Sequence, residues 1–287
     1  MGPLLDGAGG YAGQLPWSLA KLPAFPPIAH ELLRRLALAD SSVKEIAALV
    51  ARDTALSAEV LRAANSAALS RGRPIDNVPH AVTMVGLERL RAMTMTVAIM
   101  GTFLRGSVSN AMLSRCWRHS LAAAVIAERL ASHCGLPGEA AYAAALLHDI
   151  GRLGIMITFP TEYENLVRLA EEQDYPVMEC ERQLFAVDHC TAGSWMIEHF
   201  RLPPLFAEVA RRHHDAGECD RLLWLIRFAC RAASSLGYVA VRPEHLWTDE
   251  ELAVRLGRVV QISIDDVKAE VEHATGSCWP LRPRGPS

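Results

Sequence analysis

The sequence predicts an all-α fold of two packed helical subdomains, with the second subdomain folded as a helical bundle. Apolar residues recur at spacings of three and four along most of the chain, as Ile28, Leu32 and Leu36 illustrate, and this spacing places them on one face of a helix. No stretch keeps the alternation of apolar and polar residues that is typical of a half-buried strand. Runs of glycine, proline and polar residues separate these segments and mark the connections between helices.

Composition limits the classes of protein to which this chain can belong. Of its 287 residues, 51% are hydrophobic and 21% are charged, so the chain can bury a substantial core. The formal net charge of −3 offers no general attraction to nucleic acids or to an anionic membrane surface. We therefore expect neither nucleic-acid binding nor membrane association.

Targeting signals and cysteine spacing bear on the cellular compartment. The N-terminus lacks a basic start followed by an apolar core, so we expect no signal peptide. The longest strongly apolar stretch, 92–104, is shorter than the roughly twenty residues that a membrane-spanning helix needs. The 7 cysteines form no Cys-x-x-Cys pair, which favours reduced thiols over a disulfide framework. These features predict a cytoplasmic protein.

The N-terminal part of the chain is expected to form a leader followed by three capped or proline-preceded helices. A glycine-rich stretch, 1–20, is expected to be a flexible leader. A helix is expected over 28–38. Ser42 and Glu45 have the spacing of a capping box and open a second helix, and Asp53 can cap the third.

A further helix is expected over 75–87. Asn65 lies near the end of the preceding helix, where we expect its side chain to bond freed backbone groups. A helix–turn–helix interpretation of 53–90 would make 79–90 the recognition helix, but that segment offers only Arg89 as a basic residue, so packing is favoured over DNA binding. Four methionines are expected to fill the core: Met84, Met93, Met95 and Met100.

The composition turns polar at 105–110, where we place the junction between an N-terminal subdomain, 21–107, and a second subdomain, 108–215. Helices of the second subdomain are expected over 111–133, 140–149, 162–173, 177–185, 191–200 and 206–214. Gly193 is expected to allow close packing of the helix that contains it.

The remaining features concern the outer face and the C-terminal region. Glu179 and Glu181 are expected on a solvated helix face. Helices over 222–236 and 250–274 are expected to complete the bundle within 216–275. A proline-containing tail, 276–287, is expected to be disordered.

The stretch Ala143–Leu153 carries a vicinal pair of potential metal ligands, His148 and Asp149. Gly151 is expected to interrupt the helix, because glycine adopts the left-handed conformation that ends helices. A lone buried His-Asp pair is more often a hydrogen-bonded pair within the core than a metal site. This pair has partners elsewhere, namely His119, Asp188, His189, His213 and His214. Imidazole nitrogens and carboxylate oxygens are ligands of divalent ions, so these residues could form a one- or two-metal pocket.

The order His, His-Asp, Asp-His and His-His resembles the HD superfamily of metal-dependent phosphohydrolases. Four N-terminal segments narrow the resemblance to the HDOD domain, the HD-related output domain of bacterial signalling proteins: Leu22–Pro27 (LPAFPP), Asp53–Leu56 (DTAL), Arg62–Ala67 (RAANSA) and Ala81–Leu87 (AVTMVGL). The Leu202-Pro203-Pro204 step and the histidine doublet match the same family. The resemblance covers 21–215 and implies that the second subdomain is an HD-like helical bundle.

The resemblance also implies roles for individual residues. In active HD enzymes the first histidine, the His-Asp pair and a later aspartate hold one divalent ion, and further histidines hold a second. On this chain the first three roles fall to His119, His148 and Asp149. The candidates for the other positions are His189, His213 and His214. The implied ion is iron, manganese or zinc, and if the chain is an enzyme, its candidate catalytic residues are His148, Asp149 and Arg152.

Three departures from the pattern argue against hydrolysis. Cys230 stands where the family pattern leads us to expect the later aspartate, and a thiolate is a softer ligand than a carboxylate. The Gly-Tyr-Pro motif of the HD-GYP phosphodiesterases of cyclic di-GMP is absent from the sequence. Arg152 replaces the lysine that follows His-Asp-Ile-Gly in those enzymes, which changes the hydrogen-bond geometry.

Two hypotheses of function follow. The favoured one is a signal-transduction output protein that acts through protein–protein interaction or ligand sensing, with a degenerate HD site and with other signalling proteins as partners in trans. The alternative is a metal-dependent phosphohydrolase or phosphodiesterase that acts on a nucleotide or cyclic dinucleotide. Self-association stays open, because an apolar helix face can be either core or interface.

Overall fold

The computed structural model of the chain describes residue 19 and residues 22–36, 42–68, 74–103, 111–242, 245–260 and 262–277. In this part of the chain every regular element is a helix, and no strand occurs. The all-α prediction is therefore confirmed.

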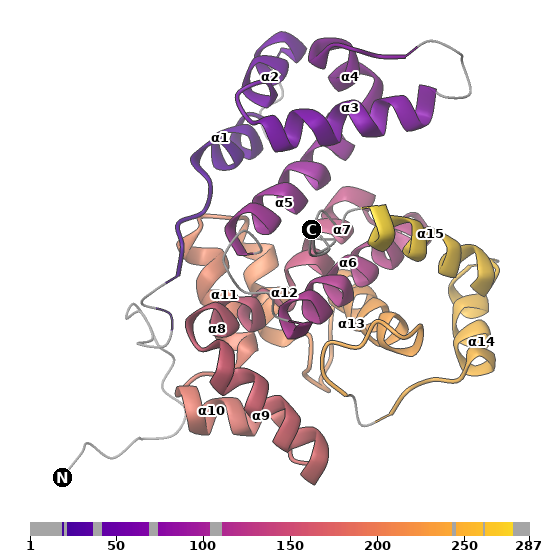
Figure 1. Cartoon of the computed structure of the whole chain (residues 1–287). Coiled ribbons are helices and arrows are strands. Elements are labelled where there is room, and N and C mark those ends of the chain that lie inside the picture. Colours follow the sequence, from indigo (N-terminus) through magenta and orange to yellow (C-terminus); the bar gives the residue numbers. More distant parts are fainter. Residues whose placement is uncertain are drawn as a thin grey trace, which may run out of the picture.

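The helices form an N-terminal unit, a bundle and a C-terminal pair (Figure 1). The first five are α1 (Pro27–Leu36), α2 (Val43–Val50), α3 (Thr54–Ala68), α4 (Val78–Val85) and α5 (Leu87–Phe103). The bundle comprises α6 (Ala111–Ala131), the short 3-10 helix η2 (Ser132–Cys134), α7 (Gly138–Leu147), α8 (Ile150–Thr158), α9 (Pro160–Gln173), α10 (Val177–Phe185), α11 (His189–His199), α12 (Pro204–Arg212) and α13 (Arg221–Ser235). The C-terminal pair is α14 (Asp249–Val259) and α15 (Ile264–Ser277).

The buried apolar side chains form two separate cores. Side chains of α1 to α4, with Leu90 of α5, enclose the smaller core. The larger core draws on α5 to α15, and α5 contributes Ala92, Met95 and Phe103 to it. Helix α5 therefore joins the units, as Figure 1 shows, because Leu90, Met93 and Val97 pack in the smaller core while other side chains of the same helix pack in the larger one.

Polar caps fix the starts of the N-terminal helices, as the sequence predicts. Ser42 Oγ accepts a hydrogen bond from the backbone N–H of Glu45 at 3.2 Å. The Glu45 carboxylate accepts one from the backbone N–H of Ser42, which completes the capping box. Asp53 Oδ1 accepts from the N–H of Leu56 at 2.9 Å at the start of α3. Each cap satisfies an N–H that has no partner within its helix.

Asn65 has a structural role that reaches beyond its own helix. Its amide donates to the carbonyls of Leu61 at 2.9 Å and Ile75 at 2.8 Å, and its oxygen accepts from the N–H of Ile75 at 2.8 Å. The expected backbone bonding is confirmed, and two of the three bonds join α3 to the segment before α4.

The helix expected over 75–87 is shorter than predicted. Gly86 adopts a φ of 81° and separates α4 from α5, a conformation that glycine adopts without steric cost. The predicted burial of Met84 is wrong, because this residue is exposed at the end of α4, whereas Met95 is buried and Met93 and Met100 are half-buried.

The centre of the bundle is unusually apolar. By length and composition, the stretch Gly138–Thr158 could cross a membrane, but 89% of its most apolar window is buried inside the protein. Helices α6 and α13 cover α7. In this structure the stretch is the core of a helical domain.

Gly151 does not end a helix, so that expectation is wrong. It lies inside α8, and the chain breaks earlier, at His148 and Asp149. A Cβ on Gly151 would lie 2.0 Å from the carbonyl oxygen of His189 and 2.6 Å from the amide nitrogen of Gly193. The absence of a side chain allows α8 and α11 to touch backbone to backbone, which confirms the close packing expected at Gly193.

Three expectations about the ends of the chain need comment. The helix expected over 250–274 is two helices, because Val260 is extended and ends α14. Leu19, expected in the leader, is buried in the larger core, whereas most of 1–20 lies outside the described residues. Residues 104–110 and 278–287, which hold the expected junction and most of the expected tail, also lie outside them.

Candidate functional site

The predicted ligands gather where several bundle helices begin or end. His148 follows the last residue of α7, and Asp149 precedes α8. His119 lies within α6, His189 begins α11, and His213 directly follows α12. All five residues are buried.

Three of the histidines are oriented in the same way, by a backbone carbonyl. Nδ1 of His119 bonds the carbonyl of Tyr238 at 2.7 Å, Nδ1 of His148 bonds that of Ala145 at 2.5 Å, and Nδ1 of His213 bonds that of Ala210 at 2.8 Å. A carbonyl only accepts, so each Nδ1 carries the hydrogen and each Nε2 presents a lone pair. Second partners of this kind fix the tautomer of metal-ligating histidines.

The three Nε2 atoms converge on the carboxylate of Asp149. The distance from Nε2 to Oδ2 is 3.9 Å for His119 and 3.6 Å for His148. Nε2 of His213 lies 3.3 Å from Oδ1. Ligand atoms held about 2.0–2.1 Å from one ion in a tetrahedral site are about 3.4 Å apart. The ligand atoms of His148, Asp149 and His213 also lie within 4.8 Å of one another, so these three side chains suit the coordination of one divalent ion.

The protonation state of His148 also suits a cation. In the described part of the chain, Nε2 of His148 and Nε2 of His213 are buried without a hydrogen-bond partner. Burial lowers the pKa of His148 to about 3, so its imidazole is neutral at physiological pH. A neutral imidazole with an unpartnered lone pair is the state that binds a metal.

Cys230 of α13 stands beside this cluster. Its Sγ lies 3.5 Å from Nε2 of His119, and the three side chains of His119, His148 and Cys230 place one ligand atom each within 4.8 Å of one another. Burial raises the pKa of the Cys230 thiol to about 12. A bound metal would have to displace this proton before the sulfur could ligate.

Arg152 also binds the Asp149 carboxylate, through the oxygen that His213 approaches. Its Nε donates to Asp149 Oδ1 at 3.0 Å, and its Nη1 donates to Glu181 Oε1 at 3.1 Å. Nη1 also donates to the hydroxyl of Tyr163 at 2.9 Å, and that hydroxyl donates to Glu181 Oε1 at 2.6 Å. The guanidinium thus joins two buried carboxylates.

His189 completes this network. Its Nδ1 donates to Glu181 Oε2 at 2.6 Å, and its Nε2 lies 3.0 Å from Nη2 of Arg152. Because a guanidinium only donates, Nε2 of His189 is the acceptor and the ring is neutral. The lone pair of His189 is therefore directed at Arg152, in contrast to the lone pairs of His148 and His213.

A second set of ligand types adjoins the first. His189, Cys190, His213 and His214 place one ligand atom each within 4.8 Å of one another. His214 is the exposed member, and its ring centre lies 4.1 Å from that of His213. The structure thus brings together all six residues that the sequence marks as ligands: His119, His148, Asp149, His189, His213 and His214.

Sequence reasoning missed Glu181 and Cys190, and assigned no cap to Asp188. The expectation of a solvated Glu181 is wrong, because this residue is fully buried. Val177, Glu181 and Phe185 share one helix face by their spacing of four, which is the signal that could have placed Glu181 inside. Asp188 caps α11 by accepting from the N–H of Thr191 at 2.8 Å.

Comparison with known proteins agrees with this architecture. The chain matches the HDOD domain over residues 22–216. A protein of Treponema pallidum (strain Nichols) is 24% identical over 196 residues, which are 68% of this chain and 38% of that protein. This chain therefore matches little more than a third of the length of that relative.

Solved structures show the same fold. An HDOD domain protein of Geobacter sulfurreducens superposes with a TM-score of 0.74 and 26% identity, covering 91% of this chain and 94% of that one. A candidate phosphohydrolase of Shewanella amazonensis SB2B superposes with a TM-score of 0.70 and 22% identity, with the same coverage. The family match over more than half of the chain, together with this fold, identifies the chain as a member of the HDOD domain family.

Proposed function

We propose that this protein is a regulatory output protein of bacterial signalling, in which the HD-type cluster binds a single divalent ion as a structural or sensing site. The observation that carries the proposal is the internal cation Arg152, which lies between Asp149 and Glu181 and faces His189. A two-metal phosphohydrolase would place its second ion beside such carboxylate and imidazole groups. Here a guanidinium already bonds both carboxylates and faces the imidazole.

Closure of the site supports the same proposal. The exposed fraction of the side chain is 0% for His148, 4% for Asp149 and 0% for His213. A phosphodiester must reach the metal and a bound water directly before either can act on it. Burial of all three side chains therefore favours a structural or sensing ion over a catalytic one.

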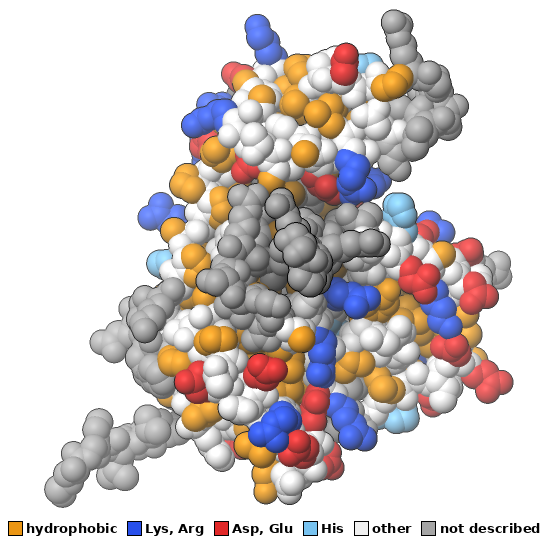
Figure 2. All heavy atoms as spheres, viewed as in Figure 1, with side chains coloured by type: hydrophobic (Ala, Val, Ile, Leu, Met, Phe, Trp, Pro, Cys, Tyr) orange, Lys and Arg blue, Asp and Glu red, His pale blue; other side chains and the backbone are white. Residues whose placement is uncertain are grey.

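The N-terminal unit supplies the proposed surface for a protein partner in trans. Hydrophobic side chains reach its surface in Figure 2, and Val43, Met84 and Leu87 are among the exposed large hydrophobic residues. They belong to α2, α4 and α5, outside the bundle that contains the cluster. Exposed apolar groups of this kind favour contact with another protein.

The ligand chemistry favours zinc or iron over magnesium. Three imidazoles and one carboxylate suit borderline ions such as zinc, iron and manganese. Cys230, 3.5 Å from Nε2 of His119, adds a soft ligand that favours zinc among these.

Metal content tests the proposal. We expect about one ion per chain, by elemental mass spectrometry, in protein purified without tag or chelator. Asp149→Ala should lose the ion, whereas His245→Ala, which removes an exposed histidine that faces Glu251 and belongs to none of these ligand groups, should retain it. Absence of metal from the wild type, or equal content in Asp149→Ala, would contradict the proposal.

A phosphohydrolase is the second candidate, and one observation favours it. His189, Cys190, His213 and His214 lie close enough to hold another ion if Arg152 withdraws from His189. That enzyme would bind two ions per chain and would hydrolyse a nucleotide or cyclic dinucleotide. If this candidate is correct, His148→Ala abolishes turnover without unfolding the chain. A wild-type protein that binds a single ion and shows no turnover would exclude it.

A further inference from the structure

A positively charged cleft lies between α13, α14 and the end of α6, apart from the histidine cluster. Its volume is about 480 Å³, which is within the range of small-molecule sites. The lining includes Arg231, Arg255 and Arg258 together with Trp224 and Trp247, and no carboxylate. Most of this cleft is built from residues beyond the family match, which ends at residue 216.

The arginines of the cleft are held in place yet keep free hydrogen-bond donors. The guanidinium carbon of Arg231 lies 5.0 Å from the ring centre of Trp247, and that of Arg255 lies 4.6 Å from it. Stacking uses the face of a guanidinium and leaves the N–H groups at its edge. In the described residues neither arginine pairs with a carboxylate, and the same holds for Arg258. Three permanent charges therefore lack a counter-ion.

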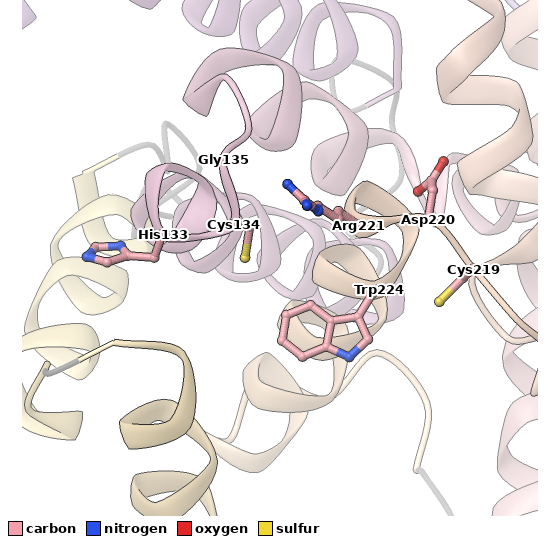
Figure 3. Close-up of a pocket in the computed structure, with 7 residues that line it drawn as sticks. All are labelled: His133, Cys134, Gly135, Cys219, Asp220, Arg221 and Trp224. Atoms are coloured by element: carbon pink, nitrogen blue, oxygen red, sulfur yellow. The ribbon is translucent and has the colours of Figure 1, made fainter.

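Trp224 supplies an aromatic surface next to these charges. It is 42% exposed, and its ring stacks on Phe228 at a centroid distance of 5.6 Å. It also lines an adjoining cavity of about 500 Å³, in which Figure 3 shows its indole ring beside Arg221 and Cys134. An exposed indole flanked by unpaired arginines suits a ligand that joins a planar ring to an anion.

We propose that this cleft binds a nucleotide, with its base stacked on Trp224 and its phosphates held by Arg231, Arg255 and Arg258. Stacking on an aromatic ring accepts any base, and guanidinium groups bind phosphate oxygens through paired N–H donors. A cleft of this limited volume with an exposed ring favours a small planar anion over an extended acidic peptide. This proposal is independent of the metal site, because the cleft shares no ligand with the cluster.

Equilibrium binding to the full chain tests the proposal, with ADP as the probe. By isothermal titration calorimetry we expect ADP to bind at least about tenfold more tightly than inorganic phosphate or adenosine. Inorganic phosphate can contact only the arginines, and the base of adenosine can contact only the tryptophan. Arg231→Gln and Arg255→Gln should each weaken ADP binding about tenfold. Trp224→Ala should weaken it by a similar factor.

Matched control variants distinguish binding in the cleft from a general effect of charge and from loss of folding. Arg52→Gln removes an exposed arginine that pairs with no carboxylate in the described residues, and Tyr175→Ala removes an exposed aromatic ring; both should retain wild-type affinity. Circular dichroism should show that all of these variants are folded. Absence of ADP binding at millimolar concentration would overturn the proposal, and so would equal binding by the cleft variants. Tighter binding of a glutamate-rich peptide than of ADP would overturn it in favour of a peptide site.

Discussion

Nη2 of Arg152 lies 3.0 Å from Nε2 of His189, and this contact places a permanent positive charge among the ligand side chains of the cluster. The same guanidinium bonds Asp149 and Glu181. Its charge offsets one of two buried carboxylates, so the cluster keeps a net negative charge that a divalent ion can neutralise. On the function proposed above, this arginine limits the cluster to a single divalent ion.

Loss of Arg152 should destabilise the protein strongly. Arg152→Met leaves Asp149 and Glu181 buried without their shared cation, and breaking a buried ion pair costs about 3–5 kcal/mol. Urea unfolding followed by circular dichroism measures the change. The control Arg168→Met removes an exposed pair with Glu172 and should cost less than about 1 kcal/mol. Similar losses in the two variants would show that the Arg152 network contributes little.

Stability should depend on pH through Glu181. Burial alone would raise the pKa of this carboxyl, but the hydrogen bond from His189 and the charge of Arg152 outweigh burial and lower the pKa to about 2. Because the folded pKa lies below the unfolded value, the stabilisation is complete above about pH 4.5 and is lost as the pH falls towards 2. The total is about 3 kcal/mol.

Glu181→Gln should therefore remove most of the change in unfolding free energy between pH 4.5 and 2. Denaturant unfolding at several pH values measures that slope. Glu172→Gln changes an exposed glutamate and should retain the wild-type slope. A wild-type slope in Glu181→Gln would assign the acid sensitivity to other groups.

Gly151→Ala should destabilise the contact between α8 and α11. The added Cβ would lie 2.0 Å from the carbonyl oxygen of His189, and a backbone atom cannot move aside as a flexible side chain can. We expect a loss of about 3 kcal/mol or more in unfolding free energy. Gly257→Ala meets nothing within 4 Å in α14 and should be stabilising by up to about 1 kcal/mol. A neutral Gly151→Ala would contradict the close backbone packing.

Asn65→Ala should destabilise the N-terminal unit. The variant loses three hydrogen bonds, two of them to Ile75, and each is worth about 1 kcal/mol. Asn77→Ala, which removes the cap of α4, should cost only about 1 kcal/mol. Thermal unfolding of the two variants compares these losses, and an equal shift would show that the bonds to Ile75 contribute nothing extra.

The helices and their caps follow from local sequence. The capping box at Ser42 and the cap at Asp53 depend on residues within one turn of each other, so spacing alone predicts them. The helix boundary at Val260 depends on how the chain packs after α14, and the expectation of a single helix over 250–274 was wrong. The expectation of a buried Met84 was also wrong, because the exposure of this side chain depends on where α4 ends.

The sequence by itself determined the all-α fold, the family and the six candidate ligand residues of the cluster, because residue type and local spacing carry that information. Only the tertiary structure decided which nitrogens converge on Asp149, that Arg152 faces His189, and that Glu181 is buried beside them. His119 is oriented by a carbonyl 119 residues away, and Arg152 reaches Glu181 across 29 residues. Such contacts depend on how the helices pack against one another, and helical periodicity within one segment does not record that packing.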